Sequence, residues 1–362
     1  MKNKLLRACS MIAGALLVLS VAAGSAVAEK EKPVLLKVPV AFGTNLPGLG
    51  DPIVYISDRI GTLSGGSLKM KVYEPKKLVA PFEILDAVSK GKVNAGYATA
   101  GYWAGKIPAA PLFSAVPFGP EAGEYMAWLY YGNGMKLYQE MYDSAGFNVK
   151  VLLAAVIAPE TSGWFKEPVK SVDDFKGLRM RFFGLGGQVM EKLGVSVSLL
   201  PGGEIFPALE KKAIDATEFS MPAIDQRLGF YKIASHNYYP GWHQQATIFE
   251  LLINKDAWKK MSDRQRMVLE VICKASVADS FAHTEAIQGK IIRENAEKRG
   301  VKNMYWSDEM LDTFKKTWNE VAKEQAANDP FFKKVWDDFS AFHKDYSYWA
   351  SLGFLPRPKP QK

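Results

Sequence analysis

The stretch "SVDDFKGLRMRFFGLGGQVMEKLG", residues 171–194, carries the pattern that decides the fold class. Ser171 opens a short helical segment, and residues 178–184 predict a strand. Glycines then interrupt the chain before a helix with apolar residues at helical spacing. A strand that passes through a glycine turn into a helix is the repeating unit of α/β proteins.

The same order of elements recurs on both sides of this stretch. Residues 84–98 and 205–219 each predict a short helix, a basic turn and a strand that ends in small or aromatic residues. Residues 34–42 and 68–74 predict strands on either side of a helix over 53–64. Strands separated by helices predict βαβ units and a mainly parallel sheet. The two halves therefore predict two similar α/β lobes.

From about Lys255 onward the sequence predicts helices. Ser262 followed by Gln265 is a capping-box pattern in front of a long helix. Tyr305 and Trp306 predict one more short strand, and the apolar residues beyond it recur at helical spacing, which indicates helix-packing faces. Two α/β lobes with a helical C-terminus favour a bilobal solute-binding protein, because ligands gather at strand ends in the cleft between such lobes.

The first 28 residues are a predicted export signal. Lys2, Lys4 and Arg7 form a basic start, an apolar run follows, and residues 26–28 are an A-x-A cleavage site. Serines and glycines interrupt the run, which makes it a poor membrane span. An uncleaved N-terminal anchor is the alternative. We therefore expect an exported protein of the periplasm.

Composition and motifs exclude several classes of function. The formal net charge is +8, but no basic stripe interleaved with aromatics is present, so we expect no nucleic-acid partner. Cys273 is the one cysteine beyond the signal, and its apolar helical surroundings predict a buried thiol and no internal disulfide. The sequence has no H-E-x-x-H, G-x-S-x-G or Walker motif, so we expect no enzyme.

Arg181 is the main candidate for a ligand-binding residue. It lies near the end of its predicted strand, before glycines that let the backbone approach a ligand and a helix start that can meet an anion. An arginine there can hold a carboxylate through two parallel hydrogen bonds. A surface arginine is the alternative. Arg179 shares the strand face but lies further from the cleft, so we expect it to be solvent-facing or structural.

Glu218 ends another predicted strand and is followed by Phe219. A carboxylate beside an anion-binding arginine can bind a hard cation through oxygen, or it can pair with Arg181. Both remain open at this point.

Two aromatic segments also stand at predicted strand ends or crossings. "YYPGWHQQ", residues 238–245, concentrates aromatics and amides at a predicted crossing between the lobes. "GYWAGK", residues 101–106, places Tyr102 and Trp103 at a strand end of the first lobe. Aromatic walls with a few polar groups suit a small-ligand pocket, and core packing is the alternative for these rings.

Long blocks of the chain resemble the DctP-type extracytoplasmic binding subunit of TRAP transporters. The blocks lie between about residues 35 and 345, and they are "FEILDAVSKGKVNAGYATAGYWAGKIPAA" (82–110), "AVPFG" (115–119), residues 171–194, "LPGGEIFPALEKKAIDATEF" (200–219) and "LGFYKIASHNYYPGWHQQ" (228–245). The branch that they resemble binds 2-oxo acids and related carboxylates together with a cation. The resemblance implies an α/β, two-lobed periplasmic binding protein-like fold (type II-like) with long connecting helices and a helical C-terminus. It also implies a receptor that closes on a small organic carboxylate and delivers it to separate TRAP membrane permease subunits.

The resemblance further implies a set of site residues. The arginine that clamps the substrate carboxylate in this family corresponds to Arg181. The acid and the backbone carbonyl that ligate a cation, Na⁺ or Ca²⁺, correspond to Glu218 and Phe219. A third cation contact, which also contacts substrate, corresponds to Glu160. The remaining implied substrate contacts are Gln244, Tyr102, Trp103 and Phe219.

The chain departs from the family pattern in this region. Glu160 stands where the family has an amide, and Gln244 stands where it has an acid, which could preserve the charge of the site while moving it across the pocket. Met221 and Ala223 follow in a segment where a large aromatic is usual. We expect the pocket to suit a larger or more apolar acid.

The expected domain limits follow from these patterns. The signal peptide covers residues 1–28, lobe 1 covers 29–155 and is completed by about 247–345, lobe 2 covers 156–246, and a C-terminal tail covers 346–362.

Two other functions fit the same sequence. A periplasmic receptor of the same fold would pass its ligand signal to a membrane kinase. A secreted hydrolase would use Glu218 and Glu160 as an acid–base pair, although no sugar-binding context accompanies them. The aromatic-rich residues 331–349 can pack on their own lobe or on a second copy of the chain in a homodimer.

Overall fold

The computed structural model describes residues 31–357, and the chain divides into a unit of residues 1–33 and a unit of residues 34–362. The second unit is described here. The predicted signal peptide, residues 1–28, and the last five residues of the predicted tail lie outside the described residues. Across residues 31–357, none of the helices combines the length and the apolar character that crossing a membrane requires.

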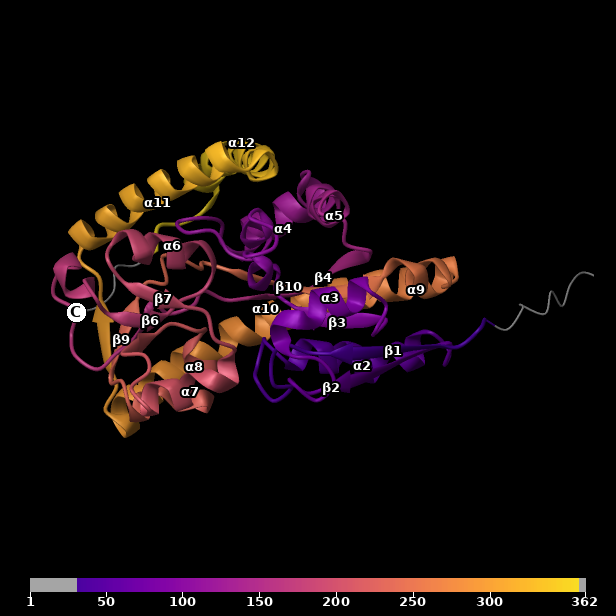
Figure 1. Cartoon of the computed structure of the whole chain (residues 1–362), viewed down its shortest axis with the longest axis horizontal. Coiled ribbons are helices and arrows are strands. Elements are labelled where there is room, and N and C mark those ends of the chain that lie inside the picture. The colour runs from indigo at the N-terminus through magenta and orange to yellow at the C-terminus, as the bar shows by residue number, and fades with distance from the viewer. Residues whose placement is uncertain (1–30, 358–362) are drawn as a thin grey trace, which may run out of the picture. The chain divides into compact units, whose positions relative to one another are not determined.

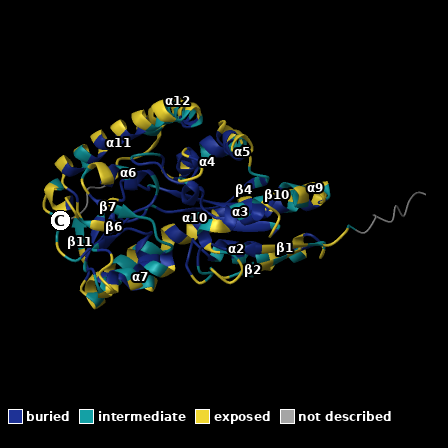
Figure 2. Ribbon diagram, in the orientation of Figure 1, coloured by how far each residue is buried: buried dark blue, intermediate teal, exposed yellow. Residues whose placement is uncertain are grey.

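The first lobe is built on five strands. β1 (Val34–Pro39) pairs in parallel with β2 (Leu68–Tyr73) (Figure 1). β10 (Thr247–Asn254) lies between β3 (Ala95–Ala98) and β4 (Val149–Ile157) and is antiparallel to both. A parallel bridge from Val40 to Tyr97 joins the two groups. β3, β4 and β10 are almost wholly buried (Figure 2), as expected of strands that helices cover, whereas β1 and β2 leave part of their side chains exposed.

Helices cover both groups of strands in lobe 1. α2 (Asp51–Leu63) packs on β2, and α3 (Ile84–Ser89) packs on β3 and β10. α4 (Ala122–Tyr131) and α5 (Gly134–Ser144) pack on each other, and α5 also contacts β4. α9 (Lys255–Lys259) follows β10 directly, and the Asn254 side chain caps its first turn.

The second lobe is built on one six-stranded sheet with the order β11-β9-β5-β8-β6-β7. The strands are β11 (Lys302–Tyr305), β9 (His236–Tyr239), β5 (Gly163–Phe165), β8 (Ala216–Thr217), β6 (Arg179–Arg181) and β7 (Ser196–Ser198). β5 is antiparallel to β8 and β9, whereas the other pairs are parallel. The helices of this lobe are α6 (Gly184–Lys192), α7 (Gly202–Glu210) and α8 (Pro222–Leu228).

The expectation of mainly parallel sheets is wrong, because the sheets are mixed. The strands that run against their neighbours are β5 and β10. Both follow a segment, 158–162 or 240–246, that brings the chain straight from a strand of one lobe into the other lobe. Such a strand enters without the helical crossover that makes neighbouring strands parallel.

Short 3₁₀ helices complete the two lobes at Pro81–Glu83 (η1), Ala100–Trp103 (η2), Ala110–Phe113 (η3), Val172–Phe175 (η4) and Phe230–Lys232 (η5). The Ser171 side chain and Asp174 form a capping box around η4, as the opening stretch of sequence predicts.

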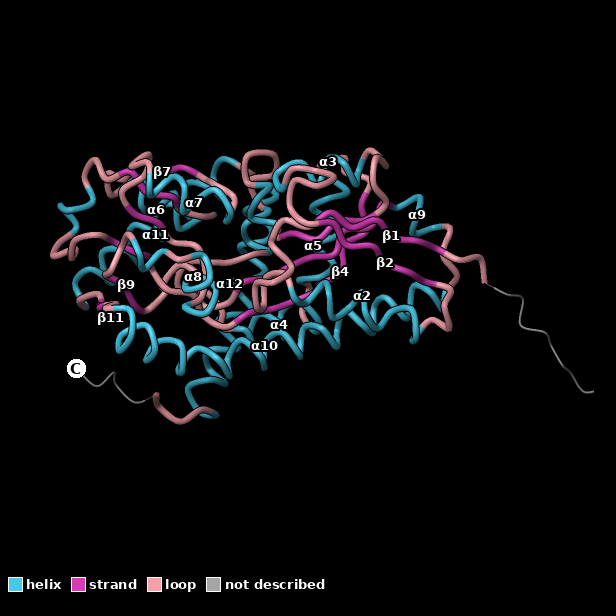
Figure 3. Tube along the Cα trace, turned by 90° about the horizontal axis from the view of Figure 1, so that it is seen from below, coloured by secondary structure: helices cyan, strands magenta, loops and turns pink. Residues whose placement is uncertain are grey.

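A third connection between the lobes is α10 (Asp263–Arg299), a helix of 37 residues. It contacts α2 and β4 in lobe 1, and α8 and β11 in lobe 2 (Figure 3). The predicted capping box of Ser262 and Gln265 opens it, and Gly300 ends it with a φ of 68°, which a glycine adopts readily.

The C-terminal helices contact both lobes. α11 (Asp308–Asn328) packs on α6 of lobe 2, and α12 (Pro330–Gly353) packs on α4 and α5 of lobe 1 (Figure 1). Gln325 donates a hydrogen bond to Gln188 across the first contact. Trp128 donates its indole N–H to Asp338 across the second.

Strand β11 belongs to the sheet of lobe 2 and not to lobe 1, where its residues were expected. β11 falls within residues 247–345, the range expected to complete lobe 1, yet it pairs with β9 at the edge of the lobe 2 sheet. The domain limits otherwise stay a prediction.

Candidate functional site

A small cavity lies where the two lobes meet. Lobe 1, lobe 2 and both crossing segments all contribute to its wall. Its lining residues are Phe42, Leu49, Thr99, Tyr102, Glu160, Arg181, Phe183, Phe219, Gln244, Thr247 and Phe249. Six of the seven residues predicted as site residues are therefore in or next to one cavity, and Trp103 is the exception.

Arg181 ends strand β6 with its side chain buried at 1% exposure. Nη1 donates to the backbone oxygen of Glu218 at 2.7 Å and to its Oε1 at 2.8 Å, while Nε donates to the Leu200 carbonyl at 3.2 Å. The guanidinium also lies over the Phe219 ring, 5.0 Å from its centroid. Nη2 makes no hydrogen bond to any described residue, so it can bind an anion in the cavity.

Arg179 has a different role, as the sequence predicts. It is exposed, and its Nε and Nη2 atoms hold Asp215 at 2.9 and 2.7 Å. Arg179 therefore braces the strand from outside, while Arg181 faces inward.

Glu218 has one satisfied and one unsatisfied oxygen. Oε1 accepts hydrogen bonds from Arg181 and from the Phe183 backbone N–H, at 2.8 and 2.5 Å. Oε2 is buried without a hydrogen-bond partner and lies 3.6 Å from Nε2 of His243. Burial would raise the pKa of Glu218, but the Arg181 guanidinium, His243 and the Phe183 amide together hold it below its usual value.

Glu160 and Gln244 meet across the two crossing segments. Thr247 donates to Oε1 of Glu160 at 2.9 Å and accepts from Nε2 of Gln244 at 2.8 Å. Oε2 of Glu160 and Oε1 of Gln244 are both buried without a partner. Burial, and then the charge of Glu218, raises the pKa of Glu160 well above its usual value. A cation beside it would relieve this cost.

His243 and Asp225 belong to the site although the sequence did not predict them there. His243 is 1% exposed, and neither ring nitrogen has a hydrogen-bond partner. His243 directly precedes Gln244, a predicted site residue, and this position in the sequence could have identified His243 as a candidate. Asp225 accepts from the Trp164 indole at 2.7 Å, and burial raises its pKa to about 8. No local pattern points to Asp225, because it lies inside helix α8.

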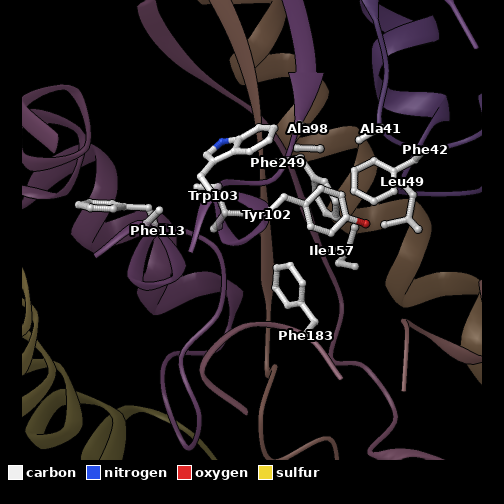
Figure 4. Packing of buried hydrophobic residues seen from close by; sticks show 14 of the residues in the cluster. Ala41, Phe42, Leu49, Ala98, Tyr102, Trp103, Phe113, Ile157, Phe183 and Phe249 are labelled. Atoms are coloured by element: carbon white, nitrogen blue, oxygen red, sulfur yellow. The ribbon is translucent and has the colours of Figure 1, made fainter. Parts of the chain in front are cut away.

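Aromatic rings form the apolar part of the wall (Figure 4). Tyr102 of lobe 1 packs edge-on against Phe183 of lobe 2 with the ring centroids 5.6 Å apart, and it packs in a tilted arrangement on Phe42 at the same centroid distance. Gly101 allows this closeness, because a Cβ there would lie 2.1 Å from the tip of the Phe183 ring. An apolar wall lowers the local dielectric constant, which strengthens the electrostatic interactions of Arg181.

Trp103 points away from the cavity. Its indole donates to Oε1 of Glu250 at 2.8 Å, deep in lobe 1. Tyr138 and Tyr142 donate to the same carboxylate. In the 3₁₀ helix η2, adjacent residues point in different directions, so Tyr102 and Trp103 cannot both face the ligand.

A larger cavity adjoins the first and shares Phe42 and Phe219 with it. Two contacts join the lobes at its rim. Lys76 of lobe 1 pairs with Glu204 of α7 at 2.5 Å, and Arg227 of α8 donates to the Asn45 carbonyl. The lobes are therefore in contact on the cavity's outer side as well as at the rings.

The chain is similar in sequence to known solute-binding proteins. The family model for "Bacterial extracellular solute-binding protein, family 7" (DctP) matches residues 50–329. The chain is 35% identical over 300 residues to a monocarboxylate 2-oxoacid-binding periplasmic protein of Nostoc sp., which covers 83% of this chain and 82% of the relative.

Solved structures show the same two-lobed fold. A TRAP transporter solute-binding protein from Bordetella bronchiseptica, a mixed-occupancy dimer with calcium and picolinate, matches with a TM-score of 0.86 at 27% identity. That match covers 89% of this chain and 95% of the relative. A TRAP periplasmic solute-binding protein from Pseudoalteromonas atlantica, with bound sodium and pyruvate, matches with a TM-score of 0.85 at 29% identity, covering 89% and 97%. The chain belongs to the DctP family of bacterial extracellular solute-binding proteins, the receptors of TRAP transporters.

Proposed function

We propose that this protein is the periplasmic substrate-binding subunit of a TRAP transporter. It captures a small organic monocarboxylate, a 2-oxo or 2-hydroxy acid, and delivers it to the membrane permease subunits. The observation that carries the proposal is the buried guanidinium of Arg181, whose Nη2 has no partner among the described residues and which lines the cavity. Relatives that bind a 2-oxoacid and pyruvate support this class of ligand.

The residues that hold the ligand have distinct roles. Arg181 binds the carboxylate, and Glu218 fixes the position of Arg181 through Oε1. Gln244 and Glu160 contact the oxygen at the second carbon, and Tyr102 and Phe219 pack on the remainder of the acid. The cavity is also lined by Phe42, Leu49, Phe183, Phe219 and Phe249, which favours an acid with an apolar side chain.

The donor set also fits a cation. Glu218 and Glu160 each have a buried oxygen without a hydrogen-bond partner, and such oxygens, with the Phe219 carbonyl, suit a hard cation. Relatives bind sodium with pyruvate, or calcium with picolinate. When bound, a cation would supply positive charge beside the substrate carboxylate.

The two lobes, with the limits given above, are proposed to close on the ligand by a hinge motion at the crossing segments. We propose no catalytic role, because the family to which the chain belongs consists of solute-binding proteins. A sensory receptor that signals to a kinase would use the same site. Deleting the neighbouring permease genes and measuring uptake of the ligand separates transport from sensing.

A homodimer is a further proposal. The end of α12 and the residues after it leave apolar side chains exposed at Tyr348, Trp349, Leu352, Phe354 and Leu355. One related structure is a dimer. Light scattering of the purified chain measures the oligomeric state directly.

The carboxylate clamp is tested by substitution of Arg181. We expect Arg181→Ala to abolish measurable binding of 2-oxo acids, and Arg181→Lys to weaken it at least about tenfold, because lysine cannot form the planar pair of hydrogen bonds. Isothermal titration calorimetry gives the affinities. Arg179→Lys, on the same strand but facing solvent, is the matched control and should bind as the wild type does. Unchanged affinity in both Arg181 variants contradicts the clamp.

A further inference from the structure

Glu250 is a buried carboxylate that none of the proposed binding roles uses. It is 0% exposed, and it accepts hydrogen bonds from three neutral side chains, which are those of Trp103, Tyr138 and Tyr142. Burial of a carboxylate among neutral donors is costly, and it raises the pKa of Glu250 to about 7. A group that the folded protein holds at such a cost is a candidate for a function.

Glu250 lies behind the wall of the ligand cavity. Side chains along a strand alternate between its two faces, and Thr247 and Phe249 of β10 line the cavity. Glu250 follows Phe249 and therefore points to the other face, toward partners that do not line the cavity. The pairing of β10 with β4 also shifts between Phe249 and Glu250, and such irregularities are frequent next to functional sites.

The partner of Glu250 in η2 connects it to the cavity. Trp103 donates its indole N–H to Oε1 of Glu250 at 2.8 Å, and Tyr102, the residue before Trp103, lines the cavity. In Figure 4 the Trp103 indole lies on the side of η2 away from Phe183, whereas Tyr102 packs against that ring. One hydrogen bond therefore fixes one side of η2, and the other side of η2 presents Tyr102 to the ligand.

The four-residue helix η2 depends on contacts from outside, because so short a 3₁₀ helix has few hydrogen bonds of its own. At its first end, Thr99 donates a hydrogen bond to the Ile248 carbonyl of β10 at 2.9 Å. At its last end, the indole of Trp103 is bound to Glu250. Both ends are thus attached to β10, and the second attachment depends on the carboxylate.

The carboxylate is itself anchored in the body of lobe 1. Tyr142 donates to Oε2 of Glu250 at 2.7 Å, and Tyr138 donates to the same oxygen. Both tyrosines belong to α5, which packs on β4 and on α12. Glu250 therefore joins η2 to a strand and a helix that do not line the cavity.

We propose that Glu250 is a positioning residue for ligand binding, which holds η2 through the indole of Trp103 in the place from which Tyr102 faces the ligand. The inference rests on the proposed function, in which the Tyr102 ring packs on the acid. Tyr102 also packs against Phe183 of lobe 2, so its position affects the contact between the lobes as well.

Two substitutions remove the attachment of η2 without removing a residue from the cavity wall. Trp103→Phe keeps an aromatic ring and loses the N–H, and Glu250→Gln keeps the shape of the side chain and loses the charge. We expect each to lower the affinity for 2-oxo acids about five- to tenfold, because η2 then has other positions available. Calorimetry with pyruvate, 2-oxobutanoate and 2-oxohexanoate at pH 8, above the pKa of Glu250, gives the affinities. An affinity within twofold of the wild type in both variants overturns the inference.

A double-mutant cycle distinguishes positioning of Tyr102 from a general structural role. Tyr102→Leu removes the ring that Glu250 is proposed to position and leaves the Arg181 clamp in place, so binding stays measurable. In that background we expect Glu250→Gln, or Trp103→Phe, to change the affinity less than twofold. A further five- to tenfold loss in the Tyr102→Leu background shows that Glu250 does not act through Tyr102, and it overturns the inference.

Glu124→Gln is the matched control for loss of stability. Glu124 is another buried carboxylate of lobe 1, 5% exposed, and its partner is Nδ1 of His343 on α12 at 2.6 Å. We expect this variant to unfold at a lower urea concentration and to bind 2-oxo acids as the wild type does. If it loses as much affinity as Glu250→Gln, the losses reflect destabilisation and the inference fails. Circular dichroism establishes folding, and Trp103→Phe carries the cycle alone if Glu250→Gln does not fold.

The failure of this inference is separable from the failure of the proposed function. If the wild type binds 2-oxo acids and neither Glu250→Gln nor Trp103→Phe weakens binding, the positioning role fails and the carboxylate-binding function stands. If the wild type binds no organic acid, the proposed function fails, and the positioning role fails with it.

Discussion

Arg181 and Arg179 are two residues apart on one short strand and end in opposite surroundings. The difference follows from their acidic partners. Asp215 lies at the surface and takes both hydrogen bonds that the Arg179 fork offers. Glu218 is buried and engages only Nη1 of Arg181, so the other end of that fork is left for a ligand. At this scale, ligand binding depends on an ion pair, Arg181 with Glu218, in which one guanidinium nitrogen has no hydrogen-bond partner among the described residues.

Glu250 is another buried carboxylate, and its pKa predicts how the stability of the protein changes with pH. Burial raises its pKa to about 7 although Tyr138, Trp103 and Tyr142 donate to it. Because the folded state binds this proton more tightly than the unfolded state, the stabilisation is present below about pH 4.5 and is lost as the pH rises through 7. We expect the free energy of unfolding to contain a decrease of about 3 kcal/mol over this range from Glu250 alone.

Glu250→Gln should remove that decrease, so the slope of stability against pH becomes shallower than in the wild type. Urea unfolding between pH 5 and 7.5 measures the slope. Glu210→Gln, which removes an exposed carboxylate, should keep the wild-type slope. Parallel slopes in all three proteins would show that Glu250 does not carry the effect.

Much of the site can be predicted from the sequence, for reasons that differ by residue. Arg181 and Glu218 end neighbouring strands, so strand ends and glycine turns point to them, and family resemblance adds Glu160 and Gln244. His243 could not be found by spacing, because the Glu160 and Glu218 atoms that it approaches come from segments far away in the chain. Such a cluster exists only after the two crossing segments have met.

At the scale of elements, the closeness of the lobes depends on short contacts between pieces of secondary structure. η2 of lobe 1 and the start of α6 of lobe 2 touch through Gly101, Tyr102 and Phe183. The helices and their caps follow from local pattern, as the capping boxes at Ser171 and Ser262 illustrate. The strand directions do not, because they depend on where the chain crosses between lobes.

Gly101→Ala should hinder closure. The added Cβ would lie 2.1 Å from the Phe183 ring, so the two elements cannot approach as closely. We expect ligand affinity to fall at least about tenfold, with little change in the unfolding of the ligand-free protein. Calorimetry and urea unfolding provide the two measurements. Gly105→Ala, where an added Cβ meets no atom within 4 Å, is the matched control.

Phe183→Leu combined with Gly101→Ala makes the test sharper. The smaller side chain should recover part of the lost affinity, because it removes the clash. If the double variant binds no better than Gly101→Ala alone, the loss has another cause than contact with Phe183.

At the scale of the whole molecule, binding and stability are linked through the joint between the lobes. α10 contacts both lobes, and α11 and α12 contact one lobe each. A ligand that holds the lobes together therefore stabilises one connected structure. The lobes are connected by the two crossing segments, by α10 and by the C-terminal helices α11 and α12. No single stretch of the sequence predicts this combination.

A panel of organic acids should reveal the substrate through thermal stability. A ligand at 100 times its Kd adds about 2.7 kcal/mol to the free energy of unfolding. We expect 2-oxo and 2-hydroxy monocarboxylates to raise Tm, and the methyl ester of the same acid to leave it unchanged, because the ester lacks the charge that Arg181 binds. Equal shifts from acid and ester would contradict recognition of a carboxylate.

The pairing of β11 with β9 determines which residues are needed to express lobe 2 as a separate domain. A fragment cut at the two crossings, residues 158–246, would end before β11 and expose the hydrogen-bonding edge of β9. Unprotected strand edges pair with other chains, so such a fragment should self-associate in solution. An isolated lobe 2 must therefore also include residues 301–328, joined by a new linker, because these residues supply the edge strand β11 and the helix α11.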